Sequence, residues 1–175
     1  SGLGKFSALK AARDGATLIV LARNTAKGQA LCTEFENQYS DSSGKIEIVE
    51  GNLSSLESVH SACKEINLRY PVIDTIVNNA GHINFELKKT SNDIEETLQV
   101  NLLAPVLICH LLFENLKKSD DPKIIITSSG LHQGEINFDN LEFENGFSSF
   151  KAYRQSKLGV ILICRLLAKT LAKHN

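Results

Sequence analysis

The sequence lacks an excess of charge of either sign, because 19 Lys and Arg residues face 20 Asp and Glu residues and give a formal net charge of −1. Such a balance provides no general electric field that would attract nucleic acid or an anionic membrane. Internal repeats, low-complexity segments and linkers are also missing. These absences argue against a nucleic-acid-binding protein and against a chain of several domains.

Long hydrophobic runs and paired cysteines are missing too. The longest apolar runs, Leu158 to Cys164 and Leu102 to Cys109, are far shorter than the ~20 residues that span a bilayer. No CxxC pair occurs, and no histidine lies at metal-ligand spacing from a cysteine, so neither a metal site nor a disulfide framework is predicted. We expect four buried thiols of a protein from a reducing, intracellular compartment: Cys32, Cys63, Cys109 and Cys164. Whether other segments attach the protein to a membrane stays open.

What the sequence does contain is an alternation of helical and strand patterns. Its 175 residues are 42% hydrophobic and 22% charged, as in ordinary globular domains. The patterns predict helices over 4–13, 25–39, 54–69, 92–116 and 148–173, and strands over 16–22, 45–50, 72–77 and 123–127. Ser54 with Glu57, and Asn92 with Glu95, have the spacing of helix-capping boxes. The alternation predicts one doubly wound α/β domain over 1–175, with a parallel sheet between two layers of helices.

Two clusters stand where ligands bind in such domains. Ser1-Gly2-Leu3-Gly4-Lys5 directly precedes the first helix, and glycines there let a phosphate approach backbone N–H groups. Asn78-Asn79-Ala80-Gly81 follows a strand, at the sheet edge where open α/β sheets bind ligands. Either cluster could equally be a simple polar turn, because Asn and Gly favour turns.

Two further clusters carry hydroxyl groups and a cation. Thr127-Ser128-Ser129 follows the strand over 123–127, where a hydroxyl could orient a carbonyl group, although serines are common in ordinary loops. Tyr153 and Lys157 are four residues apart on the last helix and therefore share a face. A cation about 4 Å from a phenol, at an effective dielectric constant near 20, stabilises the phenolate by ~4 kcal/mol.

Together the four clusters resemble the short-chain dehydrogenase/reductase family over essentially all 175 residues. The first resembles the end of that family's TGxxxGxG loop, the second is its NNAG motif, and Val100-Asn101-Leu102 resembles its helix asparagine. Ser129 and Tyr153-x-x-x-Lys157 match its catalytic serine and YxxxK motif. The long serine-to-tyrosine spacing, Phe138-Asp139-Asn140-Leu141 and the continuation into Ser156-Lys157-Leu158 resemble the retinol-dehydrogenase-like branch.

The resemblance implies a Rossmann-like fold and a hydride-transferring oxidoreductase that acts on an alcohol or carbonyl substrate. It implies that Tyr153 is the general acid/base, that Lys157 holds the cofactor ribose, and that Ser129 binds the substrate oxygen. The residues implied to bind the cofactor are Ser1, Gly2, Leu3, Gly4, Arg23, Asn52, Leu53, Asn79, Ala80, Gly81, Tyr153 and Lys157.

Asn101 has a physical argument of its own. Pro105 lies four residues later in a predicted helix and has no N–H, so the carbonyl of Asn101 loses its helical partner. That carbonyl could hold a water leading to Lys157, which resembles the proton relay of the family. The alternative is a packing kink without function.

The cofactor choice is also open to prediction. Family members that use NAD have an acidic residue at the end of the second strand, whereas this chain has Ala22 followed by Arg23. Because an arginine suits a 2′-phosphate, we expect NADP(H), with Lys5 as a possible second contact. The alternative is that Arg23 is merely solvated. Asn52 replaces the aspartate that the family usually has near the adenine, so we expect weaker adenine recognition.

The substrate pocket is expected between residues 130 and 150, which contain His132, Phe138, Phe143, Phe147 and Phe150. Aromatic side chains there favour a lipophilic substrate, or they simply pack the loop. The rival functions are a nucleotide-sugar epimerase or dehydratase, and a catalytically silent NADPH-binding regulator. The resemblance further implies a homodimer, a first strand before residue 1 between the strands at 16–22 and 72–77, and a substrate lid after residue 175. We therefore expect the 175 residues to be a fragment that neither folds nor turns over alone.

Overall fold

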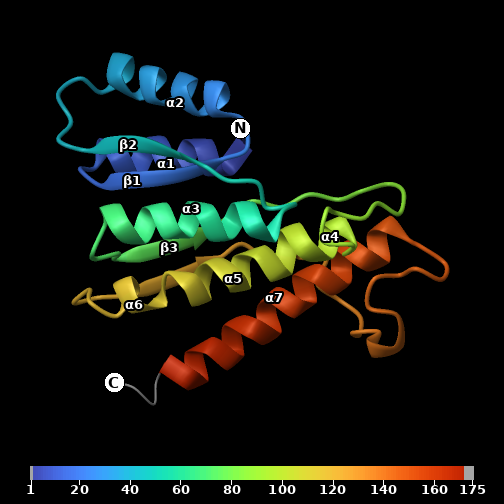
Figure 1. Cartoon of the computed structure of the whole chain (residues 1–175). Coiled ribbons are helices and arrows are strands. Elements are labelled where there is room, and N and C mark those ends of the chain that lie inside the picture. The colour runs from blue at the N-terminus through green and yellow to red at the C-terminus, as the bar shows by residue number, and fades with distance from the viewer. Residues whose placement is uncertain (1, 172–175) are drawn as a thin grey trace.

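The computed structural model describes residues 2–171, and four parallel strands lie between its helices (Figure 1). Strand β1 (Thr17–Ala22) pairs with β2 (Lys45–Glu50), in a register that sets Thr17 opposite Lys45 and Ala22 opposite Glu50. Strand β3 (Thr75–Asn78) pairs with β4 (Lys123–Ile126). The two pairs are not hydrogen-bonded to each other among the described residues, and the strand expected between them stays a prediction.

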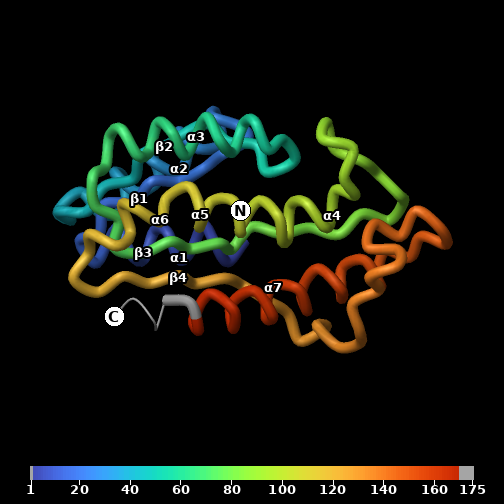
Figure 2. The backbone as a smooth tube through the Cα atoms, turned by 60° about the horizontal axis from the view of Figure 1, so that its bottom comes forward, coloured from blue at the N-terminus to red at the C-terminus, as the bar shows by residue number. Residues whose placement is uncertain are grey.

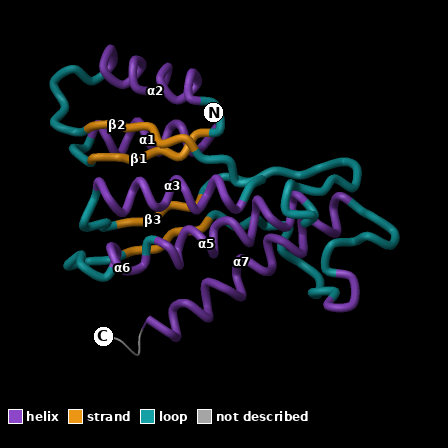
Figure 3. Tube along the Cα trace, viewed as in Figure 1, coloured by secondary structure: helices purple, strands orange, loops and turns teal. Residues whose placement is uncertain are grey.

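Helices join consecutive strands, as the parallel pairing requires. Helix α2 (Thr25–Gln38) joins β1 to β2 and α3 (Leu56–Arg69) joins β2 to β3, whereas α1 (Gly2–Arg13) precedes β1 and α7 (Ser149–Leu171) follows β4. Asn24 caps α2 by accepting a hydrogen bond from the N–H of Lys27. Ser55 caps α3 in the same way from Ser58, so the prediction that Ser54 opens this helix is wrong by one residue. The boundaries of the other elements differ from prediction by only a few residues (Figure 3).

The predicted helix over 92–116 is wrong as a continuous α-helix. The chain forms a short α4 (Glu96–Leu98), a π-helical turn (Gln99–Leu103), α5 (Ala104–Leu111) and α6 (Phe113–Leu116). The N–H of Ala104 bonds to the carbonyl of Gln99, five residues back. The wider turn comes directly before Pro105, whose missing N–H removes an ordinary helical bond.

The start of that segment also differs from its predicted capping box. Asn92 does not cap the helix, because its side-chain oxygen accepts a hydrogen bond from the N–H of Leu56. Glu95 caps it instead, and its carboxylate accepts from the N–H groups of Thr97 and Leu98. The side chain of Asn92 therefore ties this loop to the start of α3.

The main hydrophobic core lies where α3, α5 and α6 meet the strands. Val49 on β2 and Ile76 on β3 belong to it, together with Cys63 and Cys109 from the helices. A smaller cluster joins α1 and α2 through Leu9, Ala12 and Phe35. Helices cover both faces of β1 and β2, as predicted, because Leu18 and Ile46 pack on the cluster of α1 and α2 whereas Ile19 and Val49 pack on the main core. Helices of the described residues cover only one face of β3 and β4. On the other face Val77 is 56% exposed and Ile125 is 50% exposed.

The cysteines lie in or beside these cores. Cys32, Cys63 and Cys109 are buried free thiols, as predicted, whereas Cys164 is only half-buried. Burial, which dominates, raises the pKa values of Cys63 and Cys109 to about 11, so both stay protonated near neutral pH.

Helix α7 crosses the molecule and packs against α4 and the π-helical turn (Figure 2). Gly159 allows this approach, because a Cβ there would lie 2.6 Å from a methyl carbon of Leu102. Before α7, the loop over 130–148 extends beyond the amino end of the helix (Figures 1 and 2). Among the described residues, no helix combines the length and the apolar character that crossing a bilayer requires.

Gly44 provides a test of the packing between α1 and β2. A Cβ at Gly44 would lie 1.9 Å from the carbonyl oxygen of Ala12, and the same oxygen accepts a hydrogen bond from Ser42. We therefore expect Gly44→Ala to lower the free energy of unfolding of the full-length protein by about 1–3 kcal/mol or more. Chemical denaturation measures the change. Gly130→Ala is the control, because nothing lies within 4 Å of its added Cβ, and equal losses in both variants would contradict the prediction.

Glu96 provides a test by pH. Its side chain is buried, and its carboxylate bonds to Ser54, Asn84 and Lys88. Burial alone would raise the pKa of Glu96, but the hydrogen bonds from Asn84, Lys88 and Ser54 outweigh it and lower the pKa to about 2. The unfolded chain then binds this proton more readily, so the stabilisation is complete above about pH 4.5 and is lost as the pH falls toward 2.

We expect Glu96→Gln to cost about 1–3 kcal/mol of unfolding free energy at pH 7, and the difference from wild type to shrink between pH 4.5 and 2. Urea denaturation across this pH range measures it. Glu114→Gln is the control, because Glu114 is an exposed carboxylate that pairs with Lys117. A difference between wild type and Glu96→Gln that stayed constant with pH would contradict the argument.

Candidate active site

The loops that follow β1, β3 and β4 lie at one edge of the fold, where parallel strands present their carboxyl ends. The first turn of α1 reaches the same edge, since a Cβ on Gly4 would lie 2.6 Å from the side-chain nitrogen of Asn79. The side-chain oxygen of Asn79 in turn accepts a hydrogen bond from Thr127. The glycine turn and the predicted ligand-binding loops after β3 and β4 are thus adjacent.

Tyr153 and Lys157 lie together on α7. The Lys157 Nζ is 5.9 Å from the centre of the Tyr153 ring, and Lys157 is 4% exposed. The same Nζ donates a hydrogen bond of 2.9 Å to the carbonyl of Thr127, and burial lowers the pKa of Lys157. Ser128 bonds back to the carbonyl of Lys157 at 3.0 Å. The end of β4 therefore holds α7 at two points beside the phenol.

Asn101 lies beside Lys157 but uses its side chain to hold another segment. Its Oδ1 accepts from the N–H of His82 and its Nδ2 donates to the carbonyl of His82, both at 2.9 Å. The Nδ2 also donates to Ser156 on α7. Gly81 fits between the two groups, because a Cβ there would lie 3.1 Å from the Lys157 Nζ and 3.2 Å from the Asn101 Oδ1. The Asn101 side chain is thus engaged with His82 and Ser156, and the relay expected of Asn101 would use the main-chain carbonyl of this residue.

Ser129 begins a tight turn after β4. Its Oγ accepts a hydrogen bond from the N–H of Leu131, and its carbonyl accepts from the N–H of His132. Ser129 and Tyr153 share no hydrogen bond in the described structure. The turn nevertheless places Leu131 on the wall of the cavity that Tyr153 lines.

That cavity measures about 390 Å³ and is mostly apolar. It is lined by Gly81, His82, Ile83, Phe85, Leu131, Phe150 and Tyr153. Among the aromatic residues expected to form the pocket, only Phe150 does so. Phe138 is exposed and Phe143 is buried elsewhere, while His132 bonds to the carbonyl of Ser129. Phe143 therefore agrees with the alternative that these side chains pack the loop, whereas the exposed Phe138 agrees with neither interpretation.

The residues from His82 to Phe85 form another wall of the cavity, which the sequence did not predict. Their position could have indicated it, because they directly follow the NNAG motif at the carboxyl end of β3. The Nε2 of His82 is buried and has no hydrogen-bond partner among residues 2–171. A buried polar atom without a partner costs about 1–3 kcal/mol, which is tolerated more often at functional sites than elsewhere.

The residues predicted to bind the cofactor are spread along this edge. Gly2, with a φ of +61°, and Gly4 form the start of α1, and Leu3 is exposed between them. Ser1 lies outside the described residues. Asn79, Ala80 and Gly81 follow β3 toward Lys157. The close approach of Gly4 to Asn79, and the backbone left open at Gly2, fit a dinucleotide that crosses the glycine turn and ends beside Lys157.

The residues expected near the adenosine end are also at this edge. Arg23 directly follows β1, is exposed, and has no hydrogen-bond or ion-pair partner among the described residues. Lys5, the possible second contact, pairs with Glu34 on α2. The Asn52 Oδ1 accepts from Ser54, and its Nδ2 remains available. Leu53 packs on the main core, and its carbonyl accepts from Gln99.

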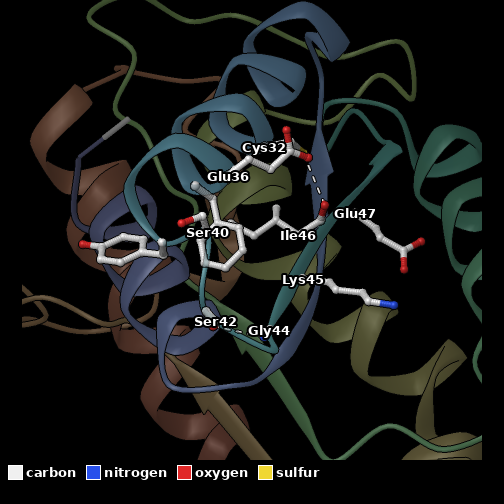
Figure 4. A pocket seen from close by; sticks show the side chains of 10 residues that line it. Cys32, Glu36, Ser40, Ser42, Gly44, Lys45, Ile46 and Glu47 are labelled. Atoms are coloured by element: carbon white, nitrogen blue, oxygen red, sulfur yellow. Dashed lines mark hydrogen bonds between the residues drawn. The ribbon is translucent and has the colours of Figure 1, made fainter.

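A second cavity, of about 540 Å³, lies at the amino end of β2 (Figure 4). The figure shows Cys32 and Glu36 of α2 beside Ile46 of β2, whereas the Lys45 and Glu47 side chains point away from α2. Burial, followed by the neighbouring Glu36 carboxylate, raises the pKa of the Cys32 thiol, which donates to the carbonyl of Ile46. This cavity is larger, but it lies away from the carboxyl ends of the strands and contains no activated nucleophile.

Comparison with known proteins agrees with this geometry. The family model for short chain dehydrogenase matches residues 1–175. Mouse retinol dehydrogenase 14 is 34% identical over 184 residues, which cover 100% of this chain and 55% of that protein. The chain thus spans about half the length of the curated relatives it matches.

Solved structures agree as well. An uncharacterized protein from Mycobacterium paratuberculosis superposes with a TM-score of 0.84 at 28% identity, over 99% of this chain and 60% of that one. The alcohol dehydrogenase of Thermococcus sibiricus, complexed with 5-hydroxy-NADP, has a TM-score of 0.71 at 21% identity and shares the fold, over 99% of this chain and 67% of its own. The chain therefore belongs to the short-chain dehydrogenase family, in its retinol-dehydrogenase-like branch, and has that family's Rossmann-type fold.

Proposed function

We propose that the protein transfers a hydride between NADP(H) and a lipophilic alcohol or carbonyl compound, with Tyr153 as the general acid/base. The observation that carries the proposal is the position of the Tyr153 side chain. It lines an apolar cavity at the carboxyl edge of the strands, and the buried Lys157 ammonium lies 5.9 Å from its ring. The nicotinamide, when bound, supplies or accepts the hydride.

Lys157 makes proton transfer by Tyr153 easier through its charge. A positive charge at this distance, in a site with an effective dielectric constant near 20, stabilises a phenolate by a few kcal/mol. The hydrogen bond from Lys157 to Thr127 keeps the charge in place, so little reorganisation is needed when the phenol loses its proton.

Ser129 and Asn101 have supporting roles in the proposal. The Ser129 Oγ accepts a hydrogen bond from the N–H of Leu131, which leaves its own proton free to donate to the substrate oxygen. The Asn101 side chain holds His82, while its main-chain carbonyl, which Pro105 cannot satisfy, offers a site for a water leading toward Lys157.

The preference for NADP(H) rests on Arg23. An exposed arginine without a partner, placed after β1 where NAD enzymes have an acidic residue, is suited to a 2′-phosphate. The bound 5-hydroxy-NADP of the Thermococcus sibiricus enzyme supports the choice. The apolar cavity and the likeness to mouse retinol dehydrogenase 14 support a lipophilic substrate. From the resemblance to the family we also propose a homodimer.

The role of Tyr153 is tested by Tyr153→Phe in the full-length protein. Removing the hydroxyl abolishes proton transfer but keeps the ring, so we expect turnover to fall by about 10²-fold or more while the affinity for NADPH stays within about threefold. NADPH absorbance with a panel of lipophilic carbonyl compounds measures turnover, and NADPH fluorescence titration measures binding. Turnover close to that of wild type would rule out Tyr153 as the acid/base.

The cofactor preference is tested by Arg23→Ala. We expect the KM for NADPH to rise by about 10–100-fold, with little change for NADH, because only the 2′-phosphate loses a charged partner. Lys5→Ala is the matched control and should have little effect, since Lys5 pairs with Glu34. A wild-type protein that used NADH more efficiently than NADPH would overturn the assignment.

A further inference from the structure

The loop over 130–148 forms part of the cavity wall, and Phe143, which is 7% exposed, is its one buried hydrophobic side chain. Leu131 lines the cavity but is 48% exposed, and Phe138 and Leu141 are 79% and 41% exposed. Figures 1 and 2 show the loop extending from the end of β4 and returning to the start of α7. Because side-chain packing is sparse, other interactions have to define its position.

Gln155 makes the main interactions that define the position of this loop. It lies on α7 between Tyr153 and Lys157 and is 4% exposed. Its Oε1 accepts a hydrogen bond of 2.7 Å from the N–H of Asn137, and its Nε2 donates one of 2.8 Å to the carbonyl of Leu141. The two bonds hold both ends of the single 3₁₀ turn of the loop, Phe138–Asn140.

Gln155 is the buried member of a larger set of ties. Next to it, the Arg154 guanidinium donates to the carbonyl of Gln133. On the far side of the loop, the Glu142 carboxylate accepts from the N–H of Glu95, and Lys89 pairs with Glu144. The ion pair is partly exposed and contributes little by itself, so the buried amide is the stronger constraint.

The direction of Gln155 excludes a direct role in the reaction. Residues two apart on a helix point about 200° apart, so Gln155 faces away from the side shared by Tyr153 and Lys157. Asn101 holds the opposite wall in the same manner, through both main-chain groups of His82. One buried amide, Asn101, thus bonds to the backbone of a cavity wall, and the other, Gln155, bonds to the backbone of the loop that carries Leu131 on another wall.

We propose that Gln155 is a positioning residue that determines which lipophilic substrates fit, because it sets the place of the 130–148 loop and hence of Leu131. The inference rests on the proposed function, since it concerns the substrate cavity of that reaction. Replacing the amide leaves the N–H of Asn137 and the carbonyl of Leu141 without partners, and the loop is then free to move.

The test compares Gln155→Leu with wild type in the full-length protein. We expect hydrogen–deuterium exchange to accelerate over 130–148, and the ratio of kcat/KM between a long-chain and a short-chain aliphatic aldehyde to change by about tenfold. The change should lie in KM rather than in kcat, and NADPH affinity should stay the same, because Tyr153 and Lys157 keep their places. Gln155→Glu keeps the acceptor for Asn137 but loses the donor to Leu141, so its effect should be intermediate.

Asn115→Leu is the matched control. Asn115 is an equally buried amide that donates to the carbonyls of Asn67 and Tyr70, remote from the cavity. The Asn115→Leu variant should be less stable than wild type. Its ratio of kcat/KM between the two aldehydes, and its hydrogen–deuterium exchange over 130–148, should stay the same as in wild type. Unchanged exchange or an unchanged ratio in both Gln155 variants would overturn the inference, as would an equal change in Asn115→Leu.

The two proposals fail in different ways. A wild-type protein that turns over no alcohol or carbonyl compound contradicts the proposed function and, with it, the effect of Gln155 on selectivity. A wild-type protein that turns over aldehydes, with Gln155 variants that keep the same aldehyde ratio, contradicts only the role of Gln155. If Gln155→Leu does not fold, Gln155→Glu decides the question by the same two measurements.

Discussion

The hydrogen bond from the buried Lys157 ammonium to the carbonyl of Thr127 is the interaction on which the geometry of the site depends. A charged amine removed from water is costly unless it finds polar partners, so its position is strongly constrained. Ser128 bonds back to the main chain of α7. These two bonds fix the height of α7 relative to β4 and thereby decide where the Tyr153 phenol lies. Among the described residues, the covered face of the strands supplies stability, but this polar contact supplies the alignment.

Buried amides extend the same principle to the rest of the site. Asn101 and Gln155 each bond to both an N–H and a carbonyl of a neighbouring loop, and Glu95 caps α4, which directly precedes the π-helical turn that contains Asn101. Hydrogen bonds are directional, whereas apolar contacts are not, so these groups can place loops that have few hydrophobic anchors. The cavity itself can then remain apolar and open, because the polar side chains that position its walls lie outside the cavity lining.

The sequence predicted most elements to within a few residues, because apolar periodicity and glycine positions reflect local backbone preferences. It failed where a distant contact outweighed the local pattern. Asn92 has the right spacing to cap a helix, but its side chain bonds to Leu56 at the start of α3. The π-helical turn before Pro105 reflects both the missing N–H and the packing of α7 on this turn. The residues His82 to Phe85 carry no motif, so only their place after β3 marks them as part of the cavity.

The sequence by itself determined the order of strands and helices, the family, and the spacing that places Tyr153 and Lys157 on one face of α7, because these follow from local periodicity and from motifs of adjacent residues. Only the tertiary structure decided that Lys5 pairs with Glu34, whereas Arg23 has no partner among the described residues, and that Asn101 and Gln155 hold the loops that carry His82 and Leu131. Each of these contacts joins residues at least 14 positions apart along the chain, and no local pattern specifies which polar side chain a buried backbone group will meet.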